Sequence, residues 1–357
     1  MFVLPIPDTE FLKEYKFSSK ILAGAYIFLA AMNSSVLFFG LSDYQAEYFK
    51  FSAILVSSTQ SLIFIYTLLT LLNPHLNRKN SMLFSVHAFI ILLFLFLFVA
   101  YFTVFNDLFL ASVSDLVLHI THPLTVLRIA FFVFYLYQII VYSLIFHKSI
   151  LSYNASIKNY YSETAKIKMN WIKVAFISAL AIGLMAIAFQ IIPSLLLDNI
   201  FTSIVVVFYM VFAIKFINYN TIYHIIEPAL DTAIPAEAEI EITQKKSSWD
   251  LYRIKVLENK YFLIEGITLI EMALLLNVSR TTLSNFINAE ENQNFNSWTN
   301  QLRISEAKIL MMRNPEFSIS HIAMKTGYSE QSNFSREFKQ VTGETPSAWK
   351  KNNIASY

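Results

Sequence analysis

Residues 318–343, SISHIAMKTGYSEQSNFSREFKQVTG, decide how the last third of the chain folds. Ser318 can cap the N-terminus of a helix with its hydroxyl oxygen. Gly327 tolerates the left-handed backbone conformation that ends such a helix in a tight turn. After the turn, three apolar residues recur at i, i+4 and i+7, which predicts one buried face on a second helix: Phe334, Phe338 and Val341. The stretch therefore predicts a helix, a tight turn and a second helix whose other face stays polar.

The same pattern begins 50 residues earlier, at Thr268. Thr268 and Glu271 have the spacing of a capping box, in which hydroxyl and carboxylate satisfy the first free N–H groups of a helix. Asn277 stands at the turn, and Asn is one of the few residues besides Gly that adopt a left-handed conformation. Ser279, which corresponds to Ser329 in the later stretch, can cap the next helix. We therefore expect two matched helix-turn-helix units, joined by a long helix over residues 296–312.

The composition of the whole chain differs from that of these units. Of 357 residues, 55% are hydrophobic and only 15% are charged, and the mean hydropathy is +0.50. This average is too apolar for a soluble protein, so part of the chain should lie in lipid. The absence of Cys excludes disulfides and Cys-ligated metal sites. The formal net charge of +2 does not indicate a partner.

Six segments are long and apolar enough to cross a bilayer, which takes about 20 residues: 20–40, 51–72, 82–105, 123–146, 171–192 and 199–217. No acidic residue interrupts their apolar runs. Buried helices of a soluble protein are the alternative, but such helices carry polar faces that these segments lack. We predict an all-α protein in which a six-helix transmembrane bundle precedes a C-terminal domain with tandem helix-turn-helix units.

The loops between these segments predict the orientation of the bundle. Lys and Arg gather in one set of loops, whereas the alternate set holds only Lys50. Loops rich in Lys and Arg stay in the cytoplasm, so the N-terminus should be cytoplasmic and six crossings should return the C-terminus there. Nothing at the N-terminus resembles a cleavable signal. The expected domains are a cytoplasmic segment 1–19, the bundle 20–217, an acidic hinge 218–248 and the domain 249–357.

Two features of the bundle are candidates for a signal site. Arg128 lies inside the fourth segment, where it can bind a signal or extend its charged group to the interface. Asp115, His119 and His122 follow one another at helical spacing in the preceding loop. They could form a metal-binding or pH-sensitive cluster, or belong to a solvated interfacial helix, and no metal site is assigned here.

No catalytic motif accompanies these features. The six Gly form no phosphate-binding loop, and the sequence holds neither a His-Glu-x-x-His pair nor a nucleophile elbow. We therefore expect neither an enzyme nor a cofactor.

Residues 250–350 resemble the DNA-binding domain of the AraC/XylS family of bacterial transcription regulators. The similarity is carried by four motifs: Arg303-Ile-Ser-Glu-Ala, Ile322-Ala, Gly327-Tyr-Ser-Glu-Gln-Ser-Asn-Phe-Ser-Arg-Glu-Phe-Lys and Thr342-Gly-Glu-Thr-Pro. Asn277 departs from the family, in which Gly is common at this turn. The hydrophobic N-terminal half is similar to membrane-bound members, which places the expected bundle in the bacterial cytoplasmic membrane.

The resemblance implies that one helix of each unit enters the major groove of double-stranded DNA, about 34 Å from the other. The expected base contacts are polar residues on the two recognition helices: Thr281, Ser284 and Asn285 in the first unit, and Gln331, Ser332, Asn333 and Arg336 in the second. The expected phosphate contacts are basic: Arg280, Lys325 and Lys339. From Asp250 onward, 12 Lys plus Arg against 11 Asp plus Glu give a net charge of only +1, so binding must rely on a local patch.

These features predict a one-component regulator that is tethered to the bilayer and senses a signal through the bundle. RNA polymerase and a second copy of the chain are further expected partners. Two alternatives stay open: a transporter or channel with an appended DNA-binding domain, and an inert anchor on such a domain.

Overall fold

The structure is a computed structural model that describes residues 15–27, 47–72, 80–104, 108–164, 170–192, 194–218, 229 and 246–354. Within these ranges the regular structure is helical, apart from one isolated bridge between Tyr161 and Thr268. The all-α prediction is therefore confirmed. The chain forms two compact units, one of residues 1–153 with 169–227 and one of residues 154–168 with 228–357.

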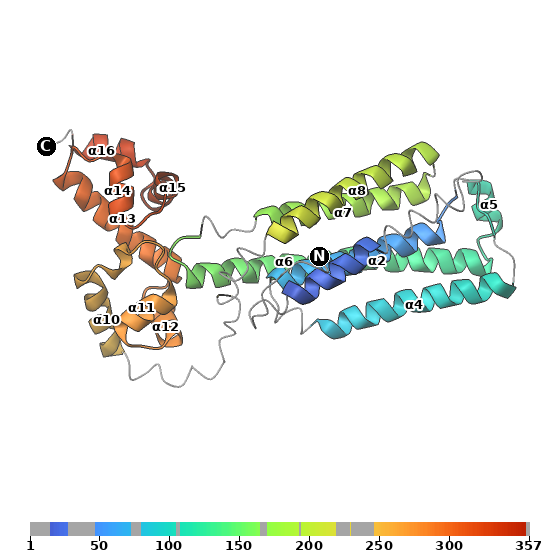
Figure 1. Ribbon diagram of the computed structural model, residues 1–357, viewed down its shortest axis with the longest axis horizontal. Helices are drawn as coiled ribbons and strands as arrows, with labels where there is room; N and C mark the ends of the chain where they lie inside the picture. Colours follow the sequence, from blue (N-terminus) through green and yellow to red (C-terminus); the bar gives the residue numbers. More distant parts are fainter. Residues whose placement is uncertain are drawn as a thin grey trace. The chain divides into compact units, whose positions relative to one another are not determined.

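Residues 15–27 are helical, and six further helices of the first unit are labelled in Figure 1: α2 (Phe51–Leu72), α4 (Ser81–Val104), α5 (Val113–Leu118), α6 (Pro123–Tyr160), α7 (Asn170–Ile191) and α8 (Leu195–Asn218). Among the described residues, five helical segments are long and apolar enough to cross a membrane: α2, α4, α6, α7 and residues Asn199–Asn218 of α8. They overlap the second to sixth predicted spans, although α6 continues past the predicted end at residue 146 to Tyr160. The first predicted span, residues 20–40, and the hinge lie mostly outside the described residues, so the six-span count stays a prediction.

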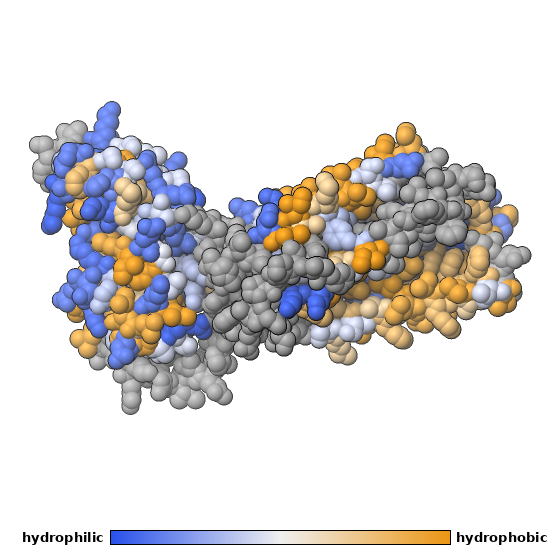
Figure 2. All heavy atoms as spheres, viewed as in Figure 1, coloured by the Kyte–Doolittle hydropathy of each residue, from blue (hydrophilic) through white to orange (hydrophobic). Residues whose placement is uncertain are grey.

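The outer surface of the first unit is apolar. Phe89, Leu92 and Phe96 on α4 are each more than 60% exposed, and Figure 2 shows apolar residues over the helices labelled α4, α7 and α8. So many exposed apolar side chains are unfavourable in water and suit contact with lipid.

Polar side chains pair inside this unit. The Ser58 hydroxyl donates to Gln138 Oε1 at 2.6 Å, and Gln138 Nε2 donates to the Tyr142 hydroxyl at 3.2 Å. The Tyr142 hydroxyl also lies 2.8 Å from His87 Nδ1, so this network joins α2, α6 and α4. Gly183 of α7 accepts a hydrogen bond from the Tyr135 hydroxyl of α6 at 3.3 Å, so α7 packs closely against a helix of the same chain.

The second unit contains the C-terminal helices α10 (Lys246–Glu258), η3 (Tyr261–Leu263), α11 (Leu269–Leu276), α12 (Arg280–Glu290), α13 (Phe295–Arg313), α14 (Ile319–Lys325), α15 (Gln331–Thr342) and α16 (Pro346–Ile354). Two buried clusters form its core. Trp249, Leu283 and Trp298 belong to the first cluster, and Ile322 and Phe334 to the second. The long helix α13 contributes to both clusters and packs against α12, α14, α15 and α16, so it joins the two helix-turn-helix units.

Candidate nucleic-acid interface

The first helix-turn-helix unit consists of α11 and α12 with the expected caps. The Thr268 hydroxyl accepts from the Glu271 N–H at 3.2 Å, and the Thr268 N–H donates to the Glu271 carboxylate at 2.8 Å. Asn277 ends α11 in the left-handed conformation, with φ 57° and ψ 45°. The Ser279 hydroxyl then accepts from the Thr282 N–H at 3.0 Å, which fixes the start of the recognition helix α12.

The second helix-turn-helix unit consists of α14 and α15, and its turn is more restricted in conformation than that of the first. Ser318 caps α14 by accepting from the His321 N–H at 3.1 Å. Gly327 has φ +82°, and a Cβ atom at this position would lie 2.5 Å from the Leu263 carbonyl oxygen. The turn therefore requires Gly both for its conformation and for its close approach to η3, the short helix before α11.

The start of α15 differs from that of α12. Its N-cap residue is Glu330, which makes no side-chain capping bond, so Ser329 does not repeat the role of Ser279. The Ser329 N–H and hydroxyl instead donate to the Glu163 carboxylate, at 3.3 and 2.9 Å. Glu163, in the segment between α6 and α7, thus lies at the N-terminus of α15.

Arg303 of α13 fixes the segment between α10 and α11, which contains η3. Its Nε donates to the Phe262 carbonyl at 2.7 Å and its Nη2 to the Ile264 carbonyl at 2.8 Å. The guanidinium also lies 5.2 Å from the centre of the Tyr328 ring. Burial lowers the pKa of Arg303 and raises that of Tyr328. The neutral Tyr328 hydroxyl donates to Asn300 Oδ1 at 2.9 Å, which links the second unit to the same helix.

The predicted base contacts differ in their exposure. On α12, Thr281, Ser284 and Asn285 are half-buried. On α15, Gln331, Ser332 and Arg336 are exposed. Asn333 was expected to face outward, but only 4% of it is exposed and its Nδ2 donates to Glu163 at 2.6 Å.

The predicted phosphate contacts are accessible to different degrees. Lys325 and Lys339 are exposed and Arg280 is half-buried. Arg336 has a side chain that is 51% exposed, and its Nη2 lies 3.3 Å from the Glu337 carboxylate. Exposed pairs of this kind contribute about 0–1 kcal/mol, so Arg336 can exchange this partner for DNA.

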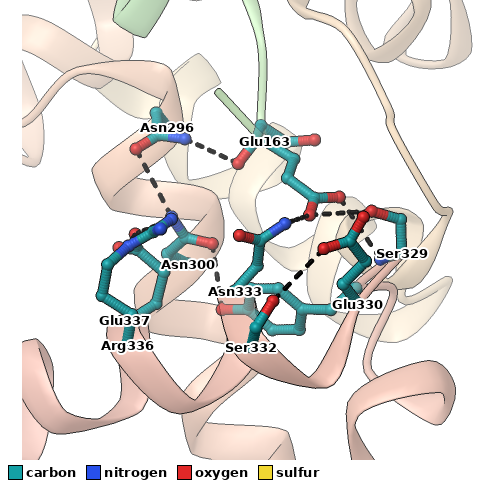
Figure 3. A network of polar contacts seen from close by, with 11 residues as sticks. Glu163, Asn296, Asn300, Ser329, Glu330, Ser332, Asn333, Arg336 and Glu337 are labelled. Carbon is teal, nitrogen blue, oxygen red and sulfur yellow. Dashed lines mark hydrogen bonds and ion pairs between the residues drawn. The ribbon is translucent and has the colours of Figure 1, made fainter. Parts of the chain in front are cut away.

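The segment 161–164 was not predicted as part of this surface, although its polar residues Ser162, Glu163 and Thr164 distinguish it from the spans around it. Figure 3 shows Glu163 directed toward Ser329 and Asn333, with Asn296 beside it. No local pattern in the sequence reveals these contacts, because Glu163 precedes Asn333 by 170 residues.

The two candidate signal features each have their own contacts in the structure. Arg128 is 1% exposed and forms an ion pair with Glu47, so its charge is neutralised inside the bundle. The Asp115 carboxylate accepts from the Ser112 N–H in the capping box of α5. The rings of His119 and His122 lie 6.4 Å apart. Among the described residues, no three metal-ligating side chains of the His, Cys, Asp or Glu type gather at one point.

Known proteins share the C-terminal part of the chain. Residues 272–352 match a family described as a helix-turn-helix domain. The HTH-type transcriptional regulator RipA of Corynebacterium diphtheriae is 36% identical over 81 residues, which are 23% of this chain and 24% of RipA. The chain thus matches about a quarter of the length of that curated relative.

Two solved structures are similar to a part of the chain. One is the C-terminal domain of AraT, a response regulator from Geobacillus stearothermophilus, with 30% identity, a TM-score of 0.27 and coverage of 29% of this chain and 84% of that chain. The other is the DNA-binding domain of AdpA, a global transcriptional factor, in complex with a target DNA, with 18% identity, the same TM-score and coverage of 30% and 94%.

The capped helices, the turns and the family match define the C-terminal part as a tandem helix-turn-helix domain. More narrowly, this domain is of the AraC type, as its sequence motifs predicted.

Proposed function

We propose that this protein is a transcription regulator that binds specific double-stranded DNA through its two helix-turn-helix units. One observation carries the proposal: in both units the first helix has a side-chain N-cap and ends in a left-handed turn, and the recognition helix keeps polar side chains. The printed descriptions of RipA and AdpA, a transcriptional regulator and a DNA-bound factor, support the same activity.

The base and phosphate contacts follow from the two recognition helices. Gln331, Ser332 and Arg336 lie at the exposed N-terminal part of α15, the part of a recognition helix that meets base edges. Thr281, Ser284 and Asn285 lie on α12, the recognition helix of the first unit. Among these residues Arg336 is the strongest candidate, because a guanidinium can bind guanine with two hydrogen bonds.

The regulator is tethered to the cytoplasmic membrane. The five apolar helices support this. A contact within the compact unit of residues 154–168 and 228–357 supports the orientation. Asn296 Nδ2 donates to the Ser162 carbonyl at 2.6 Å, so the loop between α6 and α7 lies on the same side of a membrane as the C-terminal domain. The Lys-rich composition of this loop independently favours the cytoplasm.

The bundle also senses a signal. Four helices, α2, α6, α7 and α8, line a cavity of about 150 Å³ whose lining residues carry no formal charge. Its polar groups include Gln60 and the Tyr209 hydroxyl, which lie 3.5 Å apart. Such a lining suits a small, uncharged and mostly apolar ligand that forms one or two hydrogen bonds. The cavity favours a sensor over an inert anchor, and the neutral lining does not favour an ion pathway. A second copy of the chain and RNA polymerase are the remaining proposed partners.

Selection from a random-sequence DNA pool tests the proposal. The full-length protein, reconstituted in lipid nanodiscs, should enrich duplexes that share one motif with two conserved blocks. The Arg336→Ala variant should bind the enriched duplex about 1–3 kcal/mol more weakly. Failure of the protein to enrich any sequence over repeated rounds would refute specific DNA binding.

A further inference from the structure

The segment Tyr161–Thr164 is buried against the DNA-binding domain. The Ser162 N–H donates to the Ile267 carbonyl at 3.2 Å, next to the bridge between Tyr161 and Thr268. Ser162 is 0% exposed, and it accepts from Asn296 through its carbonyl, at 2.6 Å, and from Arg303 through its hydroxyl, at 3.4 Å. The segment therefore contacts the first helix-turn-helix unit and the helix α13 that joins the two units.

Glu163 extends this contact to the second unit. Its Oε1 accepts from the Ser329 hydroxyl at 2.9 Å and from Asn333 Nδ2 at 2.6 Å, and its Oε2 accepts from the Ser329 N–H at 3.3 Å (Figure 3). Hydrogen bonds to an ionised group are stronger than those between neutral groups. The N-terminus of a helix also stabilises a negative charge, so the start of α15 is a favourable site for this carboxylate.

This position conflicts with DNA binding. The N-terminal residues of a recognition helix enter the major groove between two rows of phosphates. Asn333 can contact a base only after it releases Glu163, because its amide is committed to the carboxylate. A carboxylate at the same place would also repel the phosphates on either side.

We propose that the segment Tyr161–Thr164 is an intramolecular inhibitor that competes with DNA, with Glu163 as the group that occupies the end of α15. The inference rests on the proposed function, since it concerns the regulation of the same surface. The docked segment holds both helix-turn-helix units in a DNA-free state, and its release allows them to bind an operator.

The chain connects this segment directly to the cavity. The segment follows α6 and precedes α7, and both helices line the cavity through residues such as Tyr142 and Gly183. A ligand that binds two arrangements of α6 and α7 unequally would shift the equilibrium between docked and released segment. Ligand binding in the cavity can thus act on the DNA-binding surface through the chain that joins α6 and α7 to the segment.

Neutralising Glu163 tests the competition. Full-length Glu163→Gln in nanodiscs should bind the enriched duplex with a Kd about tenfold lower than the wild type, because a larger fraction of the protein is competent to bind. Glu344→Gln is the matched control. It removes a carboxylate beyond the opposite end of α15, where Glu344 accepts from Asn352 at 3.2 Å, and should change the Kd less than twofold.

A reversible disulfide that holds the segment in its docked position also tests the competition with DNA. Tyr161 and Thr268 form a non-hydrogen-bonded antiparallel pair, in which the Cα atoms are about 4.5 Å apart, within the range of about 4.4–6.8 Å that a disulfide spans. The chain has no Cys of its own. The double variant Tyr161→Cys with Thr268→Cys should lose DNA binding when oxidised and regain it on reduction, whereas each single variant should be insensitive to the reductant.

The outcomes separate this inference from the proposed function. Tighter binding by Glu163→Gln and redox-dependent binding by the double variant support the inhibitor. If the wild type, Glu163→Gln and both redox forms bind the duplex equally, the inhibitor is refuted and DNA binding stands. If none of these proteins binds any duplex above the level of an unrelated sequence, the proposed function itself is wrong.

Discussion

Gly327 lies where two constraints coincide, a left-handed backbone and a close approach to the Leu263 carbonyl. Gly343 has almost the same φ, +83°, but a Cβ atom there would meet nothing within 4 Å. Substituting each Gly by Ala therefore separates the free-energy cost of the left-handed conformation from that of the contact with Leu263.

We predict that Gly343→Ala lowers the free energy of unfolding of the C-terminal domain by about 1–2 kcal/mol, the cost of a left-handed conformation. Gly327→Ala should lower the free energy of unfolding by about 1–3 kcal/mol more than Gly343→Ala does, because its methyl group overlaps a backbone oxygen. Urea denaturation of the full-length protein, followed by tryptophan fluorescence, measures both. Equal losses for the two variants would show that the contact with Leu263 is absent.

Arg303 is the second residue on which the domain depends, because its guanidinium holds two carbonyl groups at once. An ammonium group is a compact donor that does not reproduce this forked geometry. We predict that Arg303→Lys lowers the free energy of unfolding by about 1.5–3 kcal/mol, the range for a hydrogen bond to a charged group. Arg313→Lys, at an exposed position in the last turn of the same helix, should change it by less than about 0.5 kcal/mol.

Single residues also show where the sequence was misleading. Val341 was expected to be buried with Phe334 and Phe338, yet it is 48% exposed. It lies in the last turn of α15, while Trp349 of α16 packs against Phe338 with a ring distance of 5.9 Å. Asn333 was expected to be exposed, and is covered by a residue distant in sequence. Periodicity predicts the face of a helix but not which later or earlier element covers it.

The recognition helix α15 combines two kinds of contact that experiment can distinguish. Arg336 and Lys339 are both exposed and lie three residues apart. We assign Arg336 to a base and Lys339 to a phosphate, since an ammonium acts as a point charge and a guanidinium as a paired donor.

We predict that Arg336→Ala relaxes the sequence preference at one base pair, whereas Lys339→Ala weakens binding to all duplexes alike. Lys339→Ala should also reduce the slope of log K against log salt by about 0.9, the contribution of one phosphate contact. Kd values measured over a salt series with matched and mismatched duplexes test both assignments. The opposite pattern, in which Lys339→Ala alters the preferred base, would exchange the two roles.

At the level of helices, the sequence predicted the fold well. The five long apolar helices, the capping box at Thr268, the left-handed Asn277 and the Ser318 cap all depend on neighbours within a few residues. The start of α15 was predicted less well, because Ser329 bonds to Glu163 instead of capping the helix. The contacts of Glu163 were not predicted, since they join elements that only the tertiary fold brings together.

The whole molecule joins an apolar bundle to a DNA-binding domain, and in the proposed function a signal bound by the bundle changes the DNA affinity of the domain. Replacing residues 1–217 with one unrelated membrane span would remove both the cavity and the inhibitory segment. We predict that this chimera binds the enriched duplex about as tightly as Glu163→Gln and no longer responds to the signal. A chimera with wild-type affinity and intact regulation in cells would favour the inert anchor.

We predict that the two helix-turn-helix units bind one face of the same duplex, an arrangement that hydroxyl-radical footprinting can resolve. Full-length protein in nanodiscs, bound to its enriched duplex, should protect two backbone segments per copy, about 10–10.5 base pairs apart. Substitutions on α12 should remove one protected segment and Arg336→Ala on α15 should weaken the other. A single protected segment that is unaffected by substitutions on α12, or uniform protection without preferred positions, would contradict the claim.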